Sequence, residues 1–463
     1  MSEKTTEMAT LEGAPIFPLL VKYSLPAIAG MVAFSLYNVV DSIFIGQWIG
    51  ADALAAIAIA FPVMNLTFAL GTLVGIGGAA VTSIRLGEKK LDAALAVLGN
   101  VLLMSLALGV GFGWGTNAFL APILRAFGAG ENTLEPAYDF MRVILFGLPA
   151  TFLFFNLNHV MRASGYPRKA MLSTIITVLV NVALAPLFIR GFGWGMRGAG
   201  AATVIAQLFG LVWILAHFLN PKSVLAFSRG IFRPSFEAMR SIVAIGLSPC
   251  LMNVCACVVV VVINRALLEH GGDVGVAAYG ILSRVQILIA MIVIGITQGM
   301  QPIVGYNHGA GATGRVRETL RYGVIAGTAV TALGGLACVL LPHLISVQFT
   351  DDAALLAVSD EALRLSCLAF PLVGMQIVIG NFYQAIGHAK LAIFLSMTRQ
   401  MLFLIPLLIA FPHFWGTRGV WLSFPVADFL AWALNVVLIL VFLKSYSAVP
   451  ADVAGTLARR EKA

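Results

Sequence analysis

The chain has 463 residues, of which 60% are hydrophobic and only 11% are charged, and its formal net charge is +8. A soluble globular domain carries about 25% charged residues, so this composition excludes a soluble protein with a polar surface. The basic residues are spread through short segments between apolar runs, which excludes a concentrated nucleic-acid footprint. The composition predicts a polytopic membrane protein whose main partner is the lipid bilayer.

Residues 1–15 form a polar N-terminal tail without the basic start, short apolar core and small-residue cleavage site of a signal peptide. The first apolar segment is therefore expected to remain as an anchor. The five cysteines lie inside apolar runs without a CxxC spacing, so neither a metal site nor a disulfide framework is predicted.

Twelve apolar runs are long enough to cross the bilayer, since a helix needs about 20 residues to span a 30 Å hydrocarbon core. They are expected near residues 16–46, 53–84, 92–116, 136–160, 169–190, 197–219, 238–268, 274–304, 319–343, 358–386, 391–411 and 418–443.

The distribution of Lys and Arg supports this number of spans. With the N-terminus inside, about 20 of the 29 basic residues fall on the cytoplasmic side. We therefore expect a multi-pass protein of the cell inner (plasma) membrane with both termini in the cytoplasm.

The second half of the chain repeats the first at a nearly constant offset. The matching pairs are Pro26/Pro249, Asp41/Asn264, Gly71/Gly295, Gly75/Gly299, Gly87/Gly311, Pro149/Pro371, Gly165/Gly387, Gly195/Gly416, Arg197/Arg418 and Gly198/Gly419. An even number of spans in each repeat keeps the two copies parallel.

The repeat predicts an all-α fold of two parallel six-helix lobes around a central cleft, an architecture suited to alternating access. The expected parts are an N-terminal lobe at 16–219, a cytoplasmic linker at 220–237, a C-terminal lobe at 238–443 and a cytoplasmic tail at 444–463. The sequence contains no HExxH, GxxxxGK[ST] or GxSxG motif, so neither an enzyme nor an ATP-driven pump is expected.

Asp41 is the most informative single residue, because it stands in the first long apolar run. A carboxylate at the bilayer centre costs about 2.5–3.5 kcal/mol, and such residues mark ion or substrate paths. Desolvation disfavours the charged form, which would let Asp41 take a proton from outside and release it inside. The alternative is that Asp41 caps a helix or pairs with a cation near the membrane surface.

Two further intramembrane charges, Arg399 and Asp428, fall on adjacent predicted spans. They are expected to form a neutralising pair, or else Asp428 forms part of a second cation or drug site in the C-terminal lobe. A drug cavity needs apolar area with a few polar anchors. Residues of these types are more often part of the core, and the candidates in the first lobe are Met31, Phe34, Tyr37, Met64 and Phe154.

Several segments together resemble the multidrug and toxic compound extrusion (MATE) family over nearly the full length of the chain. They begin with Asn38-Val-Val-Asp-Ser-Ile-Phe-Ile-Gly46 and continue with Gly75-Ile-Gly-Gly-Ala-Ala-Val-Thr-Ser-Ile-Arg-Leu-Gly87, Arg162-Ala-Ser-Gly165, Gly195-Met-Arg-Gly-Ala-Gly-Ala-Ala-Thr203, Gly299-Met-Gln-Pro-Ile-Val-Gly-Tyr-Asn-His-Gly-Ala310 and Asn381-Phe-Tyr-Gln-Ala-Ile-Gly387. Their order, spacing and duplication make the resemblance specific.

The resemblance implies twelve helices in two lobes and secondary active export of bulky, often cationic organic compounds against inward H⁺ or Na⁺. It also implies a cation site in the N-terminal lobe made of Asp41, Asn181 and Thr203, and a hinge at Pro26. The alternatives are an ordinary interhelical hydrogen bond for Asn181, a packing role for Thr203 and a static kink at Pro26.

One position departs from the family pattern. Many relatives carry an Asp four residues after the Asn of the fifth helix, and this chain has Ala185 there. A single carboxylate compensates Na⁺ poorly, which favours H⁺ as the coupling ion. No cofactor beyond the coupling ion is expected, and the small-molecule transporter is expected to be a monomer. The runner-up function is a lipid or lipid-linked oligosaccharide flippase of the related superfamily, disfavoured by the few intramembrane cations, and a channel or structural membrane protein is disfavoured by the repeat and by Asp41.

Overall fold

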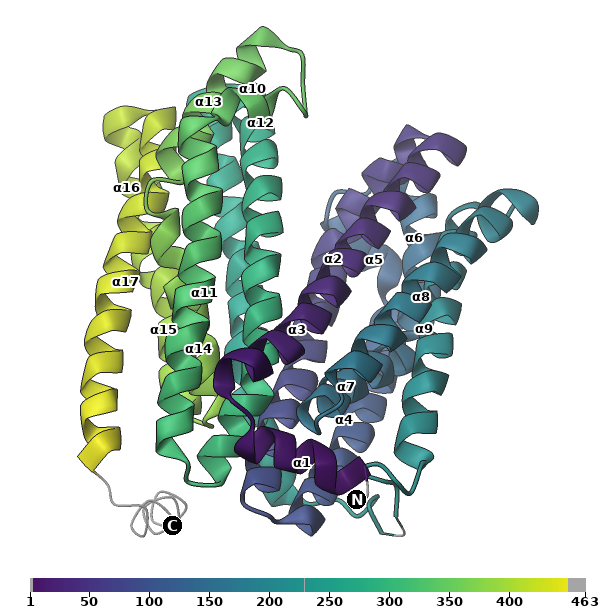
Figure 1. The fold of residues 1–463 in the computed structure, drawn as a ribbon. Helices are drawn as coiled ribbons and strands as arrows, with labels where there is room; N and C mark the ends of the chain where they lie inside the picture. Colours follow the sequence, from purple (N-terminus) through teal and green to yellow (C-terminus); the bar gives the residue numbers. More distant parts are fainter. Residues whose placement is uncertain (1–2, 229, 449–463) are drawn as a thin grey trace. The chain divides into compact units, whose positions relative to one another are not determined.

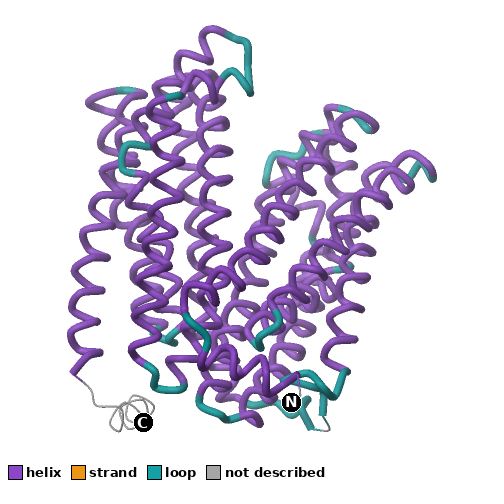
Figure 2. The backbone as a smooth tube through the Cα atoms, in the orientation of Figure 1, coloured by secondary structure: helices purple, strands orange, loops and turns teal. Residues whose placement is uncertain are grey.

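The computed structural model describes residues 3–228 and 230–448, and this part of the chain is almost entirely helical, with no β-strand among its residues (Figures 1 and 2). The helices of the first half are α1 (Glu3–Gly13), α2 (Ile16–Trp48), α3 (Ala51–Gly87), α4 (Leu91–Ala118), α5 (Leu120–Ala126), α6 (Glu131–Phe146), α7 (Leu148–Ala163), α8 (Pro167–Pro186), the π-helix η1 (Leu187–Gly191) and α9 (Gly195–Leu219).

The second half follows a similar order, with the single long helix α10 in the place of α2 and α3 and with the additional helix α16 after its π-helix. These are α10 (Phe236–Gly309), α11 (Thr313–Leu340), α12 (Pro342–Ser346), α13 (Ala353–Ser366), α14 (Phe370–Ala385), α15 (Ala389–Met397), the π-helix η2 (Thr398–Leu404), α16 (Ile405–Trp415) and α17 (Thr417–Ala448).

Twelve membrane spans result from these helices. Within the described ranges nine helices are long and apolar enough to cross a bilayer, and the bent pairs α6–α7 and α13–α14 bring the number to eleven. The 74 residues of α10 are interrupted by non-helical backbone at Gly272, with φ 60° and ψ −160°, so α10 supplies two spans. The predicted all-α fold with twelve transmembrane helices is confirmed, and the spans lie where the apolar runs indicated.

The spans expected at 136–160 and 358–386 are not single helices. Each is broken into two helices that meet at an angle, 57° between α6 and α7 and 56° between α13 and α14. Pro149 and Pro371 stand in the first turn of the helix after each break. Proline lacks a backbone N–H and restricts the residue before it, so a continuous helix ends there.

The repeat is visible in the packing as well as in the sequence. A Cβ atom on Gly198 would lie 2.7 Å from the carbonyl oxygen of Phe188, and a Cβ on Gly419 would lie 2.3 Å from that of Phe411. Both glycines therefore allow the same close approach at matching positions of the two repeats. Within the halves, α4 packs along α7, α8 along α9, and α11 along α14 (Figure 1).

The chain divides into two compact units. The first contains Met1–Ala14 and Ala29–Asn253, and the second contains Pro15–Ile28 and Val254–Ala463. Compared with the expected lobes, the units differ in Pro15–Ile28 at the start of α2 and in residues 236–253 at the start of α10. Each of these helix segments packs into the unit formed by the other repeat.

Small residues allow this exchange of helix segments. In the second unit, Ser24 Oγ donates to the carbonyl oxygen of Ile296 at 3.3 Å, and a Cβ on Gly299 would lie 2.6 Å from Ser24 Cα. In the first unit, a Cβ on Gly246 would lie 1.7 Å from the carbonyl oxygen of Leu73. The backbones therefore approach as closely as small residues permit in membrane helices.

The segments outside the spans contain more structure than their polarity indicates. The N-terminal tail holds α1, and the linker at 220–237 buries Ser223, Val224 and Leu225. The backbone N–H of Val224 donates to Tyr166 Oη at 3.2 Å. The linker is thus packed into the first unit. Of the tail expected at 444–463, α17 includes residues to Ala448 and the rest lies outside the described residues.

Candidate functional site

One face of α2 carries the polar and aromatic groups of the first unit's site. Phe34, Tyr37 and Asp41 are spaced three and four residues apart, so they lie on the same face of the helix. Asp41 Oδ1 is buried, and it has no hydrogen-bond partner among the described residues. A buried acceptor without a donor is costly, and the cost is larger for a charged one. The side chain of Asn38, on the same turn, lies outside the described residues.

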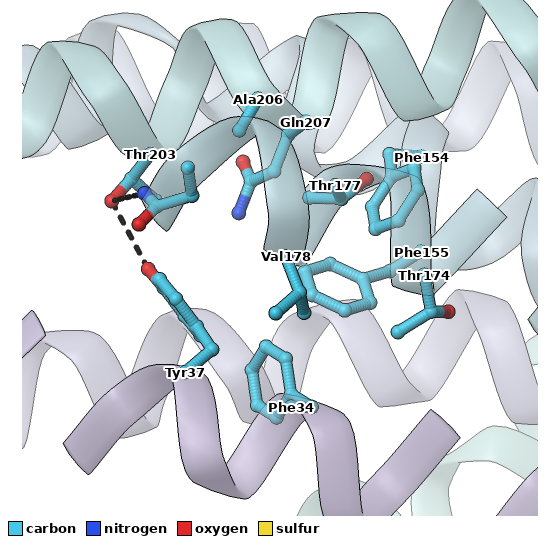
Figure 3. A pocket seen from close by; sticks show the side chains of 11 residues that line it. Phe34, Tyr37, Phe154, Phe155, Thr174, Thr177, Val178, Thr203, Ala206 and Gln207 are labelled. Carbon is cyan, nitrogen blue, oxygen red and sulfur yellow. Dashed lines mark hydrogen bonds between the residues drawn. The ribbon is translucent and has the colours of Figure 1, made fainter. Parts of the chain in front are cut away.

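Thr203 on α9 is the centre of a hydrogen-bond network that joins three helices. Its Oγ1 donates to the carbonyl oxygen of Ala199 at 3.2 Å and accepts from Asn181 Nδ2 on α8 at 3.3 Å. Tyr37 Oη on α2 lies 3.0 Å from the same oxygen (Figure 3). A hydroxyl has one proton to donate and two lone pairs. The Tyr37 hydroxyl must therefore donate, and Thr203 has no unused donor or acceptor.

A small cavity lies beside this network, inside the first unit. Its volume of about 20 Å³ is the size of about one water molecule. The lining residues come from α2, α7, α8 and α9 (Figure 3), and they are Phe34, Tyr37, Phe154, Phe155, Thr174, Thr177, Val178, Asn181, Thr203, Ala206 and Gln207. The cavity combines apolar walls with a few hydroxyl and amide groups, which is the composition of a small-molecule site.

Aromatic rings form one wall of the cavity. Phe34 meets Phe155 edge-on with ring centroids 5.8 Å apart, and Phe155 meets Phe154 edge-on at 5.0 Å. The rings of Phe34 and Tyr37 are 5.7 Å apart. Such pairs stabilise a packed aromatic cluster beyond their buried area. Three of the five residues expected to form a substrate cavity thus lie together at this wall.

The other two expected cavity residues are placed elsewhere. Met64 on α3 packs against the apolar core of the first unit and does not line the cavity, because its face of α3 turns toward that core. Met31 lies on α2 one turn before Phe34 and is also outside the lining. Hydrophobic type alone does not tell a core position from a cavity position.

Six lining residues were missed by sequence reasoning: Phe155, Thr174, Thr177, Val178, Ala206 and Gln207. The spacing along two helices could have indicated five of them. Thr174, Thr177 and Val178 on α8 precede Asn181 by seven, four and three residues, and Ala206 and Gln207 on α9 follow Thr203 by three and four residues. Each set therefore continues the helix face of a residue that had already been singled out.

Ala185, where the family resemblance led us to expect a second carboxylate, lies in fully apolar surroundings. Ala185 on α8 has no exposed surface and belongs to a core cluster with Phe188, Ile189 and Met196. The surroundings of Ala185 therefore offer apolar contacts and no charge partner from these neighbours.

Pro26 lies inside α2, which continues through it from Ile16 to Trp48. The side chain is buried, and the change from the second compact unit to the first falls between Ile28 and Ala29. The residue expected to act as a hinge thus stands two residues before the point where α2 leaves one unit for the other.

Arg399 and Asp428 are in contact in the second unit. Arg399 Nε on η2 donates to Asp428 Oδ1 on α17 at 2.5 Å, and the Asp428 side chain is only 2% exposed. Gln376 Nε2 on α14 donates to the backbone carbonyl oxygen of Asp428 at 2.8 Å. The structure thus brings together the two charges that the sequence placed on adjacent spans.

Comparison with known proteins places these features in a family. The model of the MatE family matches residues 26–187 and 244–409, one segment in each repeat. The multidrug export protein MepA of Staphylococcus aureus strain N315 is 26% identical over 441 residues, which cover 95% of this chain and 97% of MepA. Both repeats are therefore included in the similarity.

Solved structures of MATE transporters are also similar to this chain. The MATE multidrug transporter DinF-BH, solved with a bound ligand, is 37% identical with a TM-score of 0.86, covering 92% of this chain and 96% of DinF-BH. An outward-facing MATE transporter of the MOP superfamily has a TM-score of 0.90 at 23% identity, with 96% and 99% of the two chains covered, and so shares the fold. With its twelve spans, its internal repeat and these matches, the chain is a multi-pass membrane protein that belongs to the MatE family of transporters.

Proposed function

We propose that this protein is a multidrug exporter that antiports bulky, often cationic organic compounds against inward-moving protons by alternating access. The MepA and DinF-BH proteins are described as a multidrug export protein and a multidrug transporter, and the similarity to each covers more than nine-tenths of this chain. The aromatic wall and the polar network around the first unit's cavity are the kinds of groups that hold an organic compound, and the cavity, now of one-water size, would have to widen during the transport cycle to admit one.

The observation that carries the proton assignment is the state of Asp41. Its buried Oδ1 has no donor among the described residues, so the ionised form has little local compensation. Uptake of a proton removes the charge and turns the carboxyl group into a donor. Asp41 is one helical turn from Tyr37, whose hydroxyl reaches the network beside the cavity. Titration of Asp41 is therefore coupled to the cavity through a single turn of α2.

The same network argues against Na⁺. A hard cation needs several oxygen ligands. Both lone pairs of Thr203 Oγ1 already accept hydrogen bonds within the protein, and its proton is donated to Ala199. The position of the second family carboxylate is Ala185, in the apolar core. Asp41 would thus be the main oxygen ligand for Na⁺, whereas a proton needs no other ligand.

The proposal includes the cellular arrangement. The asymmetry of Lys and Arg supports insertion in the plasma membrane with both termini in the cytoplasm. The proposal also includes a monomer, because both repeats belong to a single chain.

Transport by proteoliposomes under separately imposed H⁺ and Na⁺ gradients tests the proposal. We expect the wild type to export ethidium when only a proton gradient is present. Asp41→Asn should abolish this gradient-driven export while the protein still elutes as a folded species in detergent, because the variant keeps the shape of the side chain and loses its titration.

Asp52→Asn is the matched control, since Asp52 is an exposed acid in the first turn of α3. It should export at the wild-type rate. Undiminished export by Asp41→Asn would overturn the role of Asp41, and export that requires a Na⁺ gradient would overturn the choice of the proton.

A further inference from the structure

The second unit has a counterpart to the cavity of the first. At the offset of the repeat, Phe154 corresponds to Gln376, and Val178 and Gln207 correspond to Arg399 and Asp428. The correspondence holds in local geometry, because the hydroxyls of Thr177 and Thr398, which also match in the repeat, both donate to the carbonyl oxygen four residues earlier. Three residues that line the first unit's cavity are thus replaced by a polar and charged cluster.

The charges of this cluster are held by three elements of the second unit. Asp428 on α17 is fixed from two sides, by Arg399 Nε at its Oδ1 and by Gln376 Nε2 at its backbone carbonyl oxygen. Arg399 stands in η2, a π-helical segment, whereas the corresponding part of α8 is regular α-helix. A π-helical segment re-aims side chains and is frequent at functional sites.

The guanidinium of Arg399 is used only in part. Its Nε bonds Asp428, but neither Nη makes a hydrogen bond to any residue of the described chain. The Arg399 side chain is 30% exposed, about halfway along the span formed by α15, η2 and α16. Four N–H donors of a fixed planar fork therefore remain available at membrane depth, where an unused donor is costly.

An acceptor in the cluster is also unused. Gln376 is only 8% exposed, and its Oε1 is buried without a hydrogen-bond partner in the part of the chain that the structure describes. Buried polar groups are normally paired, so a buried amide that uses only its donor side marks an incomplete site. Two residues that contact Asp428 thus each carry a polar group, the Nη atoms of Arg399 and the Oε1 of Gln376, that has no hydrogen-bond partner among the described residues.

We propose that this cluster, Gln376, Arg399 and Asp428, is a second ligand site, which takes the carboxylate of an amphoteric organic compound on the free edge of Arg399. A carboxylate matches the paired donors of a guanidinium. Asp428 is a positioning residue that holds the guanidinium and neutralises it when the site is empty. The inference rests on the proposed function in that it assumes organic compounds as ligands.

Charge balance selects the amphoteric class. The Arg399–Asp428 pair is neutral, so a simple anion would leave a net negative charge in a poorly solvated region, and a simple cation would be repelled by Arg399. A compound that carries both a carboxylate and a cationic group keeps the site neutral. The first unit has the uncharged residues Val178 and Gln207 at the matching positions, so we expect no preference for amphoteric compounds there.

A matched pair of dyes tests this site. Rhodamine 6G is a cationic ethyl ester, and its free acid carries the same ring system with a carboxylate. Binding of each dye to the full-length protein in detergent would be measured by fluorescence polarisation without any gradient. We use the double variant Arg399→Gln/Asp428→Asn, which removes both charges of the pair and leaves neither of them unpaired, and Arg399→Lys, which keeps the charge but loses the planar fork.

The double variant should lower affinity for the free acid by about tenfold or more, because charge-assisted hydrogen bonds are lost. Affinity for rhodamine 6G should stay within about twofold, since that dye has no carboxylate to lose a partner. Arg399→Lys should fall between wild type and the double variant. The control Arg418→Gln/Glu361→Gln removes an exposed ion pair of the same unit and should change neither affinity.

Three results would overturn the inference: a wild type that does not bind the free acid, a folded double variant that binds it as well as wild type, or an equal loss of both dyes. The proposed function is tested separately by gradient-driven export of ethidium through Asp41. Asp41→Asn should lose that export and keep its affinity for the free acid, so failure of one proposal does not imply failure of the other.

Discussion

At the scale of single residues, the site combines groups that the sequence identifies with groups that only the fold brings together. Asp41 could be predicted because a carboxylate inside an apolar run is costly wherever the helix lies. The bond between Tyr37 and Thr203 could not, because it joins two positions far apart in the chain and depends on the approach of α2 to α9. The number of residues between Tyr37 and Thr203 in the sequence does not indicate whether their helices lie side by side.

Thr203→Val is expected to destabilise the first unit. The substitution keeps the size of the side chain but removes the acceptor of two buried donors, on Tyr37 and Asn181. Each buried donor left unpaired costs about 1–3 kcal/mol. The midpoint of thermal unfolding in detergent should fall clearly, whereas Thr203→Ser should stay near wild type. An unfolding midpoint for Thr203→Val equal to that of wild type would show that the network contributes nothing to stability.

Gly311→Ala is expected to destabilise the turn between α10 and α11. Gly311 has φ +73° in open space, so the added methyl group meets backbone strain and no neighbouring atom. That conformation costs an L-residue about 1–2 kcal/mol. The control is Gly314→Ala, inside α11 and also in open space, which should be neutral or slightly stabilising. Equal unfolding midpoints for the two variants would contradict this interpretation.

At the scale of elements, the apolar runs located the spans but not their breaks. Hydropathy and length treat 136–160 and 358–386 as continuous, and the bends depend on where Pro149 and Pro371 interrupt the hydrogen bonds of each span. The packed linker was missed for a related reason. Its polar composition hides Val224 and Leu225, which the first unit buries.

The cytoplasmic end of α3 should show a specific pH dependence. Burial by itself would raise the pKa of Glu88, but hydrogen bonds and charges from Lys90 and Arg85 outweigh it, so the pKa lies below its usual value of 4.5. A carboxyl group whose pKa is lowered by folding contributes stability above its unfolded pKa, and this contribution is lost as the pH falls through the folded pKa.

Glu88→Gln should therefore be less stable than wild type at neutral pH, and the difference should close as the pH drops below 4.5. Thermal unfolding of both proteins in detergent at a series of pH values measures it. Asp92→Asn, at an exposed acid in the first turn of α4, serves as the control and should show no such convergence. A difference that stays constant down to acid pH would contradict the assignment.

At the scale of the whole molecule, the internal repeat made the architecture predictable. Glycines and prolines that match between the two halves at a nearly constant offset predicted two six-span halves, and the structure has a similar helix order and nearly equal bends in each. The exchange of Pro15–Ile28 and of residues 236–253 of α10 between units was not predictable, because it depends on contacts such as Ser24 with Ile296.

The repeat also explains why the two units differ in chemistry. Asp41 has Asn264 as its counterpart, and Gln207 has Asp428, so each unit carries a carboxylate where the other has an amide. In the second unit the carboxylate is neutralised by Arg399, whereas Asp41 Oδ1 has no donor among the described residues. The carboxylate whose Oδ1 lacks a donor in the described part of the chain is the one suited to exchange protons, which favours coupling in the first unit.

Proton release on substrate binding tests that assignment most directly. Purified protein in weakly buffered detergent solution would be mixed with ethidium while a pH indicator records the protons released. We expect about one proton per bound dye for the wild type, by linkage between the two ligands, and none for Asp41→Asn. Equal release by wild type and Asp41→Asn would contradict the role of Asp41 as the proton carrier.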